Sequence, residues 1–187
     1  LALTGARLDG AECLALGLAT HYLPSEALAD AKQRIANEDI ERIDGILGTL
    51  AKTQPEARIV DNIPAINRHF ASNRYENILA SLESEESAWA MKELATLRSK
   101  SPQTCKVALR QLATSIELED FADNMVMEYR IGSRVLLRPD FVEGVRAVIV
   151  DKDNAPKWDP ATPEGVTEEL LDEIFAPLPA KQEWKPL

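Results

Sequence analysis

The sequence lacks the short motifs that mark a self-contained active site. It has no Gly-x-Ser-x-Gly nucleophile elbow, no Walker-type phosphate loop and no Gly-x-Gly-x-x-Gly dinucleotide fingerprint. Histidine is scarce, since only His21 and His69 occur, and neither stands at metal-ligand spacing with Cys, Asp or Glu. We therefore predict no catalytic residue and no metal site in this chain, and favour a structural or solvent-facing role for each histidine over a catalytic one.

Three further absences narrow the class of protein. No apolar run approaches the length that crosses a bilayer. The formal net charge is −10 and no dense Lys/Arg cluster is present, so we expect no direct nucleic-acid partner and no membrane partner. Cys13 and Cys105 are far apart and belong to no motif. A reducing compartment is the simplest interpretation, with a disulfide between them as the less favoured alternative.

What the chain does have is helical periodicity. Hydrophobic residues make up 45% of the sequence, which is ordinary for a globular protein. Their spacing predicts a mostly α fold with at most one or two short strands, near residues 19–23. The expected helices cover residues 9–16, 26–37, 40–50, 59–70, 75–82, 85–97, 102–116, 119–137, 139–149 and 168–175.

Local signals predict where several helices begin, and apolar spacing predicts the buried faces of two of them. Ser101 followed by Pro102 is a favoured N-terminus, and Thr167 is a candidate cap for the last helix. The first stripe predicts that Leu109 and Leu112 are core residues; its members are Cys105, Ala108, Leu109, Leu112, Ala113 and Ile116. The second is the expected inner face of the long helix: Phe121, Ala122, Met125, Tyr129, Gly132 and Leu136. Glu128 lies among these apolar residues, so we expect an ion pair to Arg110, Arg134 or Arg146.

The best candidate for ligand binding is the charged turn Asp151-Lys152-Asp153 with the following Pro156-Lys157-Trp158. Lys152 and Lys157 are suited to bind phosphate, and Trp158 to stack on a purine. The alternative is a solvated turn in which the tryptophan anchors an extended strap to the helices, and we favour it for Trp158. The two aspartates weaken any phosphate site at this turn.

Several blocks of sequence resemble the crotonase (enoyl-CoA hydratase/isomerase) superfamily, and most closely its 3-hydroxyisobutyryl-CoA hydrolase branch. The opening Leu-Ala-Leu-Thr-Gly, Asp9-Gly10-Ala11-Glu12, Gly17-Leu18-Ala19-Thr20 and Leu23-Pro24 are similar to the run that links the catalytic core to the C-terminal helices. More discriminating for the branch are Ser101-Pro102, Leu109-Arg110-Gln111-Leu112, Met127-Glu128-Tyr129-Arg130, and Asp140-Phe141 through Trp158.

The resemblance implies that this chain is the helical C-terminal part of a hydrolase acting on 3-hydroxyisobutyryl-CoA or a similar short 3-hydroxyacyl-CoA. It places the oxyanion hole and catalytic carboxylates upstream of Leu1, so no catalytic residue carries over. Lys152, Lys157 and Trp158 remain as substrate-binding candidates. No cofactor is implied, because CoA is part of the substrate. Two alternatives stay open: a non-catalytic structural subunit, for example of a mitochondrial ribosome, and an enoyl-CoA hydratase or isomerase.

The resemblance also suggests a division of the chain and its partners. We expect a link at residues 1–37, a helical domain at 38–150, and a strap, short helix and tail at 151–187. The expected partners are the acyl-CoA substrate, the N-terminal half of the same protein and possible further copies of the chain. Removing that half should expose an apolar surface at Leu1, Leu3, Leu8, Leu14 and Leu18, unless the helices of residues 38–100 fold back over it. The expected location is the mitochondrial matrix in a eukaryote and the cytoplasm in a bacterium.

Overall fold

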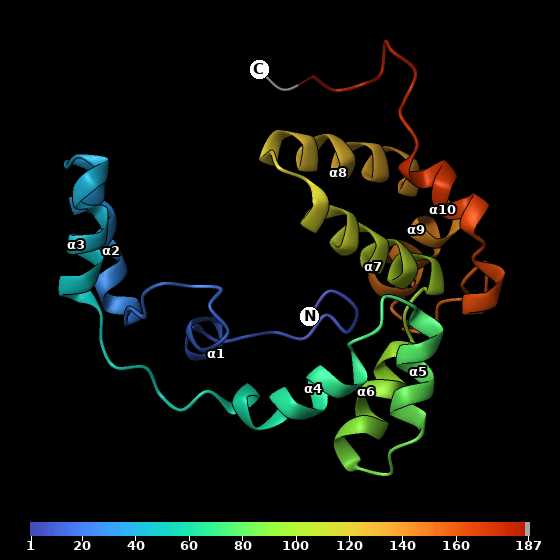
Figure 1. Cartoon of the computed structure of the whole chain (residues 1–187), viewed down its shortest axis with the longest axis horizontal. Coiled ribbons are helices and arrows are strands. Elements are labelled where there is room, and N and C mark those ends of the chain that lie inside the picture. Colours follow the sequence, from blue (N-terminus) through green and yellow to red (C-terminus); the bar gives the residue numbers. More distant parts are fainter. Residues whose placement is uncertain (186–187) are drawn as a thin grey trace. The chain divides into compact units, whose positions relative to one another are not determined.

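The computed structural model describes residues 1–185, and these form helices and loops without a β-strand. The mostly helical fold is thereby confirmed, and residues 19–23 form an extended link (Figure 1). Contacts divide the chain into two compact units. Unit 1 consists of Leu1–Gly5 and the chain from His69 onward, and unit 2 is Ala6–Arg68. The resemblance suggests a different division, with boundaries after residues 37 and 150. That division follows the sequence rather than spatial contacts, and it stays a prediction.

Unit 2 is built from short helices with few large buried side chains. Its elements are α1 (Gly10–Ala15), η1 (Ser25–Ala27), α2 (Leu28–Ala36), η2 (Ile40–Arg42), α3 (Ile43–Leu50), η3 (Arg58–Asn62) and most of α4 (Ile63–His69). Asp9, where the sequence predicts the helix to begin, caps α1 in a reciprocal capping box with Glu12. Ser25, which the sequence favours as the cap of the helix expected at residues 26–37, does not cap α2; this prediction is wrong, because Ser25 opens the 3-10 turn η1 after Pro24. The buried apolar residues of this unit are alanines, so its core is thin.

Unit 1 contains the larger helices and both hydrophobic clusters. Its elements are α5 (Tyr75–Glu83), α6 (Ala88–Arg98), α7 (Pro102–Glu117), α8 (Phe121–Val135), α9 (Pro139–Val145), the π-helical turn η4 (Arg146–Val150), η5 (Pro163–Gly165) and α10 (Glu168–Phe175). Ser101 accepts the backbone N–H of Thr104 at the start of α7, and Thr167 accepts that of Leu170 in α10. Both predicted caps are confirmed.

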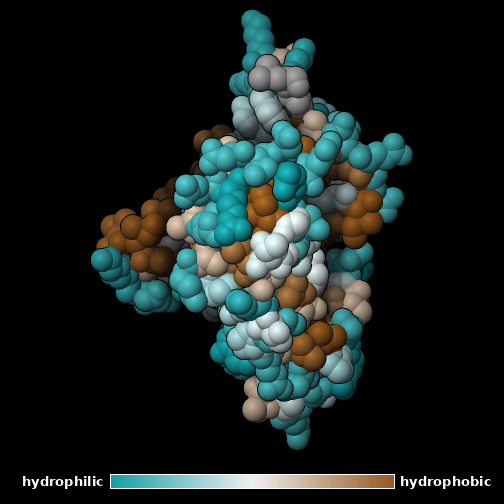
Figure 2. Space-filling view, turned by 90° about the vertical axis from the view of Figure 1, so that its left-hand side faces the viewer, coloured by the Kyte–Doolittle hydropathy of each residue, from teal (hydrophilic) through white to brown (hydrophobic). Residues whose placement is uncertain are grey.

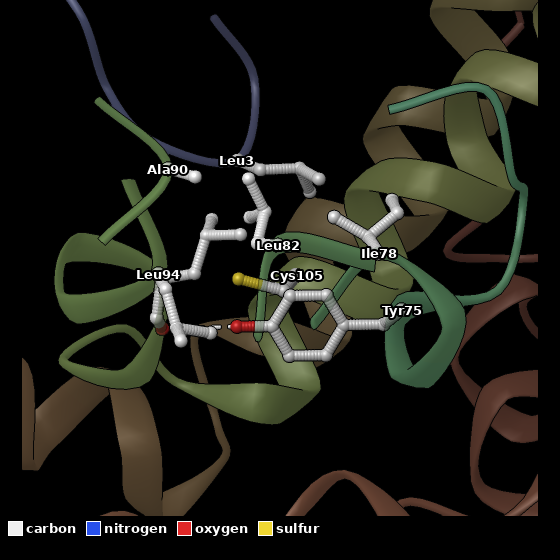
Figure 3. Close-up of a cluster of buried hydrophobic side chains, with 8 residues drawn as sticks. Leu3, Tyr75, Ile78, Leu82, Ala90, Leu94 and Cys105 are labelled. Atoms are coloured by element: carbon white, nitrogen blue, oxygen red, sulfur yellow. Dashed lines mark hydrogen bonds between the residues drawn. The ribbon is translucent and has the colours of Figure 1, made fainter. Parts of the chain in front are cut away.

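The first cluster joins α5, α6 and α7 to the start of the chain (Figure 3). Its members are Leu3, Tyr75, Ile78, Leu82, Ala90, Leu94, Leu97 and Cys105. The Tyr75 hydroxyl donates a hydrogen bond of 2.9 Å to the carbonyl oxygen of Leu97, so its polar end is satisfied inside the core. Burial raises the pKa of Tyr75 well above its ordinary value, which keeps this hydroxyl a donor.

The second cluster joins α7 and α8 to the C-terminal segment. It consists of Val107, Met127, Ile131, Val166, Leu171 and Ile174. Arg134 closes the end of α10 by donating to the carbonyl oxygens of Ile174, Ala176 and Pro177. Those carbonyls would otherwise lack partners at a helix C-terminus, so this arginine acts as a side-chain cap.

The predicted stripes are wrong in part. Cys105 is buried and Leu109 packs against the first cluster, but Leu112 is 52% exposed and Ile116 is 81% exposed. In α8 the buried residues are Met127 and Ile131, while Phe121, Tyr129 and Leu136 are exposed. Apolar side chains therefore reach the surface among the charged ones (Figure 2). The physical reason is that each helix packs against the other helices of the chain on one side only. An apolar pattern in the sequence does not say which side that is.

Two further expectations need correction. Glu128 is exposed and accepts a hydrogen bond from Asn124 at 3.2 Å, because its expected partners Arg110, Arg134 and Arg146 are engaged elsewhere. Among the five leucines expected to be uncovered, Leu1 and Leu18 are exposed and Leu8 and Leu14 half-buried. Leu3 is buried, because it inserts into the first cluster.

Candidate functional site

The charged turn after α9 is held together by a single arginine. Arg146 donates from Nε and Nη2 to the two carboxylate oxygens of Glu143, at 2.9 and 2.8 Å. Its Nη1 atom donates to Asp151 at 2.7 Å and to Asp153 at 2.6 Å. A guanidinium presents its N–H groups in a fixed plane, so one side chain sets the positions of three carboxylates. The turn is thus an ordered loop.

Electrostatics at the turn follow from these bonds. The Arg146 guanidinium, with the Lys157 backbone N–H, lowers the pKa of Glu143 to about 2. The same arginine lowers the pKa of Asp153, and the carboxylates in turn raise the pKa of Arg146 above its ordinary value. Glu143 and Asp153 are therefore ionised at neutral pH, and Arg146 pairs with both of them as well as with Asp151. This pairing reduces the repulsion that Asp151 and Asp153 would exert on a phosphate group.

The strap that follows the turn is fixed through backbone and indole contacts. The Trp158 Nε1–H donates to the carbonyl oxygen of Ser99 at 3.0 Å, and its ring lies beside Gly144 of α9. Asp140 is buried; it accepts a hydrogen bond from the Ser101 hydroxyl and another, of 2.7 Å, from the Asp159 backbone N–H. These contacts join the starts of α7 and α9 to the strap.

The three predicted substrate-binding residues share this segment in different environments. Lys152 has φ 57°, in the left-handed region, and its side chain is exposed. The side chain of Lys157 is also exposed, while its backbone N–H donates to Glu143 at 2.7 Å. Trp158 is half-buried and its indole N–H is already used. Trp158 thus makes structural contacts to Ser99 and α9, and the side chains of both lysines are exposed to solvent, that of Lys157 close enough to Glu143 to help lower its pKa.

Sequence reasoning missed the roles of Arg146 and Asp140. A signal was present, because Arg146 interrupts an apolar run and acids lie three residues before it and five and seven after it. An arginine with several acidic residues nearby in the sequence is suited to form ion pairs with more than one of them.

A second polar constellation lies at the start of unit 1. His69 is buried, its Nδ1 is 2.9 Å from the Ser81 hydroxyl, and its Nε2 is 2.8 Å from a Glu85 carboxylate oxygen. Trp89 packs near the imidazole, with ring centroids 6.1 Å apart. The order Ser–His–Glu resembles a catalytic triad, but catalysis also requires donors for an oxyanion beside an open pocket. The observed contacts tie the end of α4 to α5 and to the loop before α6, which is the structural role predicted for this histidine.

A cavity of about 310 Å³ lies between α5, α7 and α10. Lys106 and Arg110 line it, but both are engaged. The Lys106 ammonium donates to Glu76 at 2.9 Å and to two backbone carbonyls, and Arg110 donates to Asp172 at 2.6 Å. Lys106 also lowers the pKa of Glu76 against the opposing effect of burial. Lys106 and Arg110 therefore hold the C-terminal segment in place.

Within residues 1–185, no group of three or more His, Cys, Asp or Glu side chains is placed to hold a metal ion. Cys13 and Cys105 are both free, and each lies on a helix as predicted. No described helix is both long and apolar enough to cross a membrane.

Comparison with known proteins decides the family. The profile of the enoyl-CoA hydratase/isomerase family matches residues 1–175. The chain belongs to the enoyl-CoA hydratase/isomerase family. Among curated relatives of this family, the mitochondrial 3-hydroxyisobutyryl-CoA hydrolase of Xenopus laevis is 36% identical over 188 residues, covering 95% of this chain. The mitochondrial 3-hydroxyisobutyryl-CoA hydrolase-like protein 1 of Arabidopsis thaliana is also 36% identical and covers 95% of the chain.

Solved structures of the family share the fold. A carnitinyl-CoA dehydratase from Mycobacterium thermoresistibile superposes with a TM-score of 0.82 at 28% identity, over 95% of this chain and 50% of that one. An enoyl-CoA hydratase from Rhodobacter sphaeroides 2.4.1 gives a TM-score of 0.80 at 30% identity, over 96% and 51%. The chain spans about half the length of the relatives it matches, since it covers 48% of the Xenopus protein.

Proposed function

We propose that this chain is the C-terminal helical part of a CoA-thioester hydrolase acting on 3-hydroxyisobutyryl-CoA or a similar short 3-hydroxyacyl-CoA, a step of valine breakdown. The observation that carries the proposal is the match over 95% of the chain to proteins named 3-hydroxyisobutyryl-CoA hydrolase. The catalytic groups would lie outside these residues, so the chain alone would be inactive.

In this proposal the ordered turn supplies cations for the CoA moiety. Lys152 and Lys157 have exposed side chains, and Arg146 neutralises part of the charge of the three nearby carboxylates. An ammonium group suits a phosphate as a point charge. The contribution of Trp158 is to hold the strap through Ser99, so that Lys157 stays beside α9. Relatives from animals and a plant are named mitochondrial, so the proposed location is the mitochondrial matrix in a eukaryote and the cytoplasm in a bacterium.

A second candidate is a hydratase or isomerase, favoured by the solved dehydratase and hydratase structures. The two reactions are separated by assaying the full-length gene product with 3-hydroxyisobutyryl-CoA and with crotonyl-CoA. Release of free CoA thiol from the first is the result expected of the hydrolase. Loss of the enoyl absorbance of crotonyl-CoA, without thiol release from either substrate, would instead show that the protein is a hydratase.

The role of the lysines is tested in the same full-length protein. Lys152→Gln and Lys157→Gln should raise KM with little change in kcat, because each contact is made equally in the ground state and the transition state. Lys181→Gln removes an exposed lysine outside the turn and is the matched control. An unchanged KM in both turn variants would remove these residues from the substrate site.

A further inference from the structure

Asp140, in the first turn of α9, is a buried carboxylate that joins three segments of unit 1. Its Oδ2 atom accepts a hydrogen bond from the hydroxyl of Ser101, the N-cap residue of α7. Its Oδ1 atom accepts the backbone N–H of Asp159 in the strap at 2.7 Å, and Asp140 is only 5% exposed. Burying a carboxylate costs free energy, and apolar side chains of similar volume often stabilise a fold as well as buried charges do. Stability alone is therefore a weak reason for an acid at this position.

The strap passes α9 without a helical turn, and its residues alternate between two environments. Pro156, Trp158 and Pro160 are half-buried, whereas Lys157 and Asp159 are exposed. In an extended chain the side chains of successive residues point to opposite sides. The alternation therefore places the Lys157 side chain on the outer side of the strap and the Trp158 ring on the inner side.

Two carboxylates of α9 hold this alternation in register. Asp140 and Glu143 are three residues apart, so they lie on the same face of the helix. Glu143 accepts the backbone N–H of Lys157 at 2.7 Å, and Asp140 accepts that of Asp159 at 2.7 Å. A slip of one residue along the strap would break both bonds and turn Lys157 inward and Trp158 outward.

The hydrogen bond from Ser101 distinguishes Asp140 from Glu143. Glu143 is held by Arg146, which lies in the helical turn directly after α9. Asp140 is held by Ser101, whose hydroxyl oxygen also accepts the Thr104 backbone N–H at 3.0 Å. Through Asp140 the strap is thereby tied to the start of α7 as well as to α9.

We propose that Asp140 is a positioning residue for Lys157, which holds the lysine ammonium where it binds a phosphate of CoA without itself touching the ligand. This inference rests on the proposed function, because that function makes Lys157 a ligand of CoA. Asp140 acts by fixing the strap N–H two residues after Lys157. The lysine then starts from a fixed backbone and loses less conformational freedom when the phosphate binds. The pantetheine arm of CoA carries no phosphate and does not depend on this contact.

Calorimetric titration of the full-length gene product with CoA, and with pantetheine as its phosphate-free fragment, tests this role. Asp140→Ala removes both acceptors, and Asp140→Val does so while filling more of the space, in case the alanine variant does not fold. Asp140→Asn keeps an oxygen for the Asp159 N–H and an amide that can donate to the Ser101 hydroxyl. Ile131→Val, in the second cluster, controls for a mild loss of stability.

Lys157→Gln and the Asp140→Ala or Asp140→Val variant should each weaken CoA binding about fivefold and leave pantetheine binding unchanged. Asp140→Asn and Ile131→Val should stay within about twofold of the unsubstituted protein for both ligands. In the Lys157→Gln background, removal of the Asp140 carboxylate should weaken CoA binding no further, because its effect passes through the lysine.

Three results would overturn the proposal. The first is an unchanged CoA affinity after substitution of either Asp140 or Lys157. The second is an equal loss for CoA and pantetheine, and the third is a loss from Asp140→Ala that multiplies with that from Lys157→Gln. Thiol release from 3-hydroxyisobutyryl-CoA is read separately. An active enzyme whose Asp140→Ala variant binds CoA normally would reject this role and leave the proposed hydrolysis intact, whereas the predicted binding pattern without thiol release would reject the hydrolysis alone.

Discussion

A pair of leucine-to-alanine substitutions tests how unit 1 is packed. Leu82 in α5 is fully buried in the first cluster, while Leu112 in α7 is 52% exposed. Both lie within helices, so the change in helix propensity is the same and only burial differs. Sequence periodicity alone predicts that Leu112 is a core residue. Its substitution by alanine would then lower the free energy of unfolding as much as the substitution of Leu82.

The magnitudes follow from the exposed fractions. Leu82→Ala removes about three carbon groups worth about 0.8 kcal/mol each and leaves a cavity, so the loss should be about 3–5 kcal/mol. Leu112→Ala removes groups that are already half in water and leaves no closed cavity, so its cost should be about 1 kcal/mol or less. The two free energies of unfolding should therefore differ by at least about 2 kcal/mol.

Urea denaturation followed by tryptophan fluorescence measures this difference. Trp89, Trp158 and Trp184 all belong to unit 1, so the signal reports that unit without interference from unit 2. Interpretation requires an unchanged slope with denaturant, which shows that the surface exposed on unfolding is the same. A Leu112→Ala variant as unstable as Leu82→Ala would refute the packing described for α7.

Two further perturbations address the charged turn and the strap. Because the pKa of Glu143 is lowered to about 2, its contribution to stability is present above its ordinary pKa and is lost as the pH falls toward about 2. In the Arg146→Gln variant the urea midpoint should fall less between about pH 4.5 and pH 2 than in the unsubstituted protein. An unchanged pH profile would contradict the ion pair between Arg146 and Glu143. Gly144→Ala should be tolerated or stabilise by about 0.5–1 kcal/mol, since the added Cβ would meet the strap tryptophan at 3.5 Å, an ordinary contact. Gly165→Ala should destabilise by more than about 1 kcal/mol, because its Cβ would lie 2.8 Å from the Cβ of Pro160; equal midpoints for the two variants would show that this approach is not tight.

Local signals in the sequence predicted three helix starts correctly and failed at Ser25. Asp9, Ser101 and Thr167 cap the helices that their patterns indicate, because a cap depends on a side chain and on backbone N–H groups only two or three residues away. Apolar patterns gave the existence of α7 and α8 for the same local reason.

Apolar patterns failed where burial depends on distant parts of the fold. Ile116 and Phe121 continue the stripes predicted for α7 and α8, yet they are 81% and 77% exposed. An amphipathic pattern predicts that one face of a helix is buried, but it does not predict which segment covers that face. In unit 1 the face covered by this chain contains Val107, Met127 and Ile131 instead.

The sequence predicts Lys152, Lys157 and Trp158 as one candidate segment, with anchoring as the alternative for Trp158, but it does not predict how that segment is ordered. Its order depends on the five side-chain bonds of Arg146 and on the buried Asp140, which join residues up to 39 positions apart. Partners so far apart cannot be paired from one sequence, whereas a capping pattern can.

Hydrolysis of 3-hydroxyisobutyryl-CoA by the full-length gene product, compared with the 187-residue chain at the same molar concentration, tests the central claim most directly. The account predicts steady release of free CoA thiol by the full-length protein and none above the buffer rate by the chain. Turnover by the purified chain alone, scaling with its concentration and unchanged after a second purification step, would contradict the account.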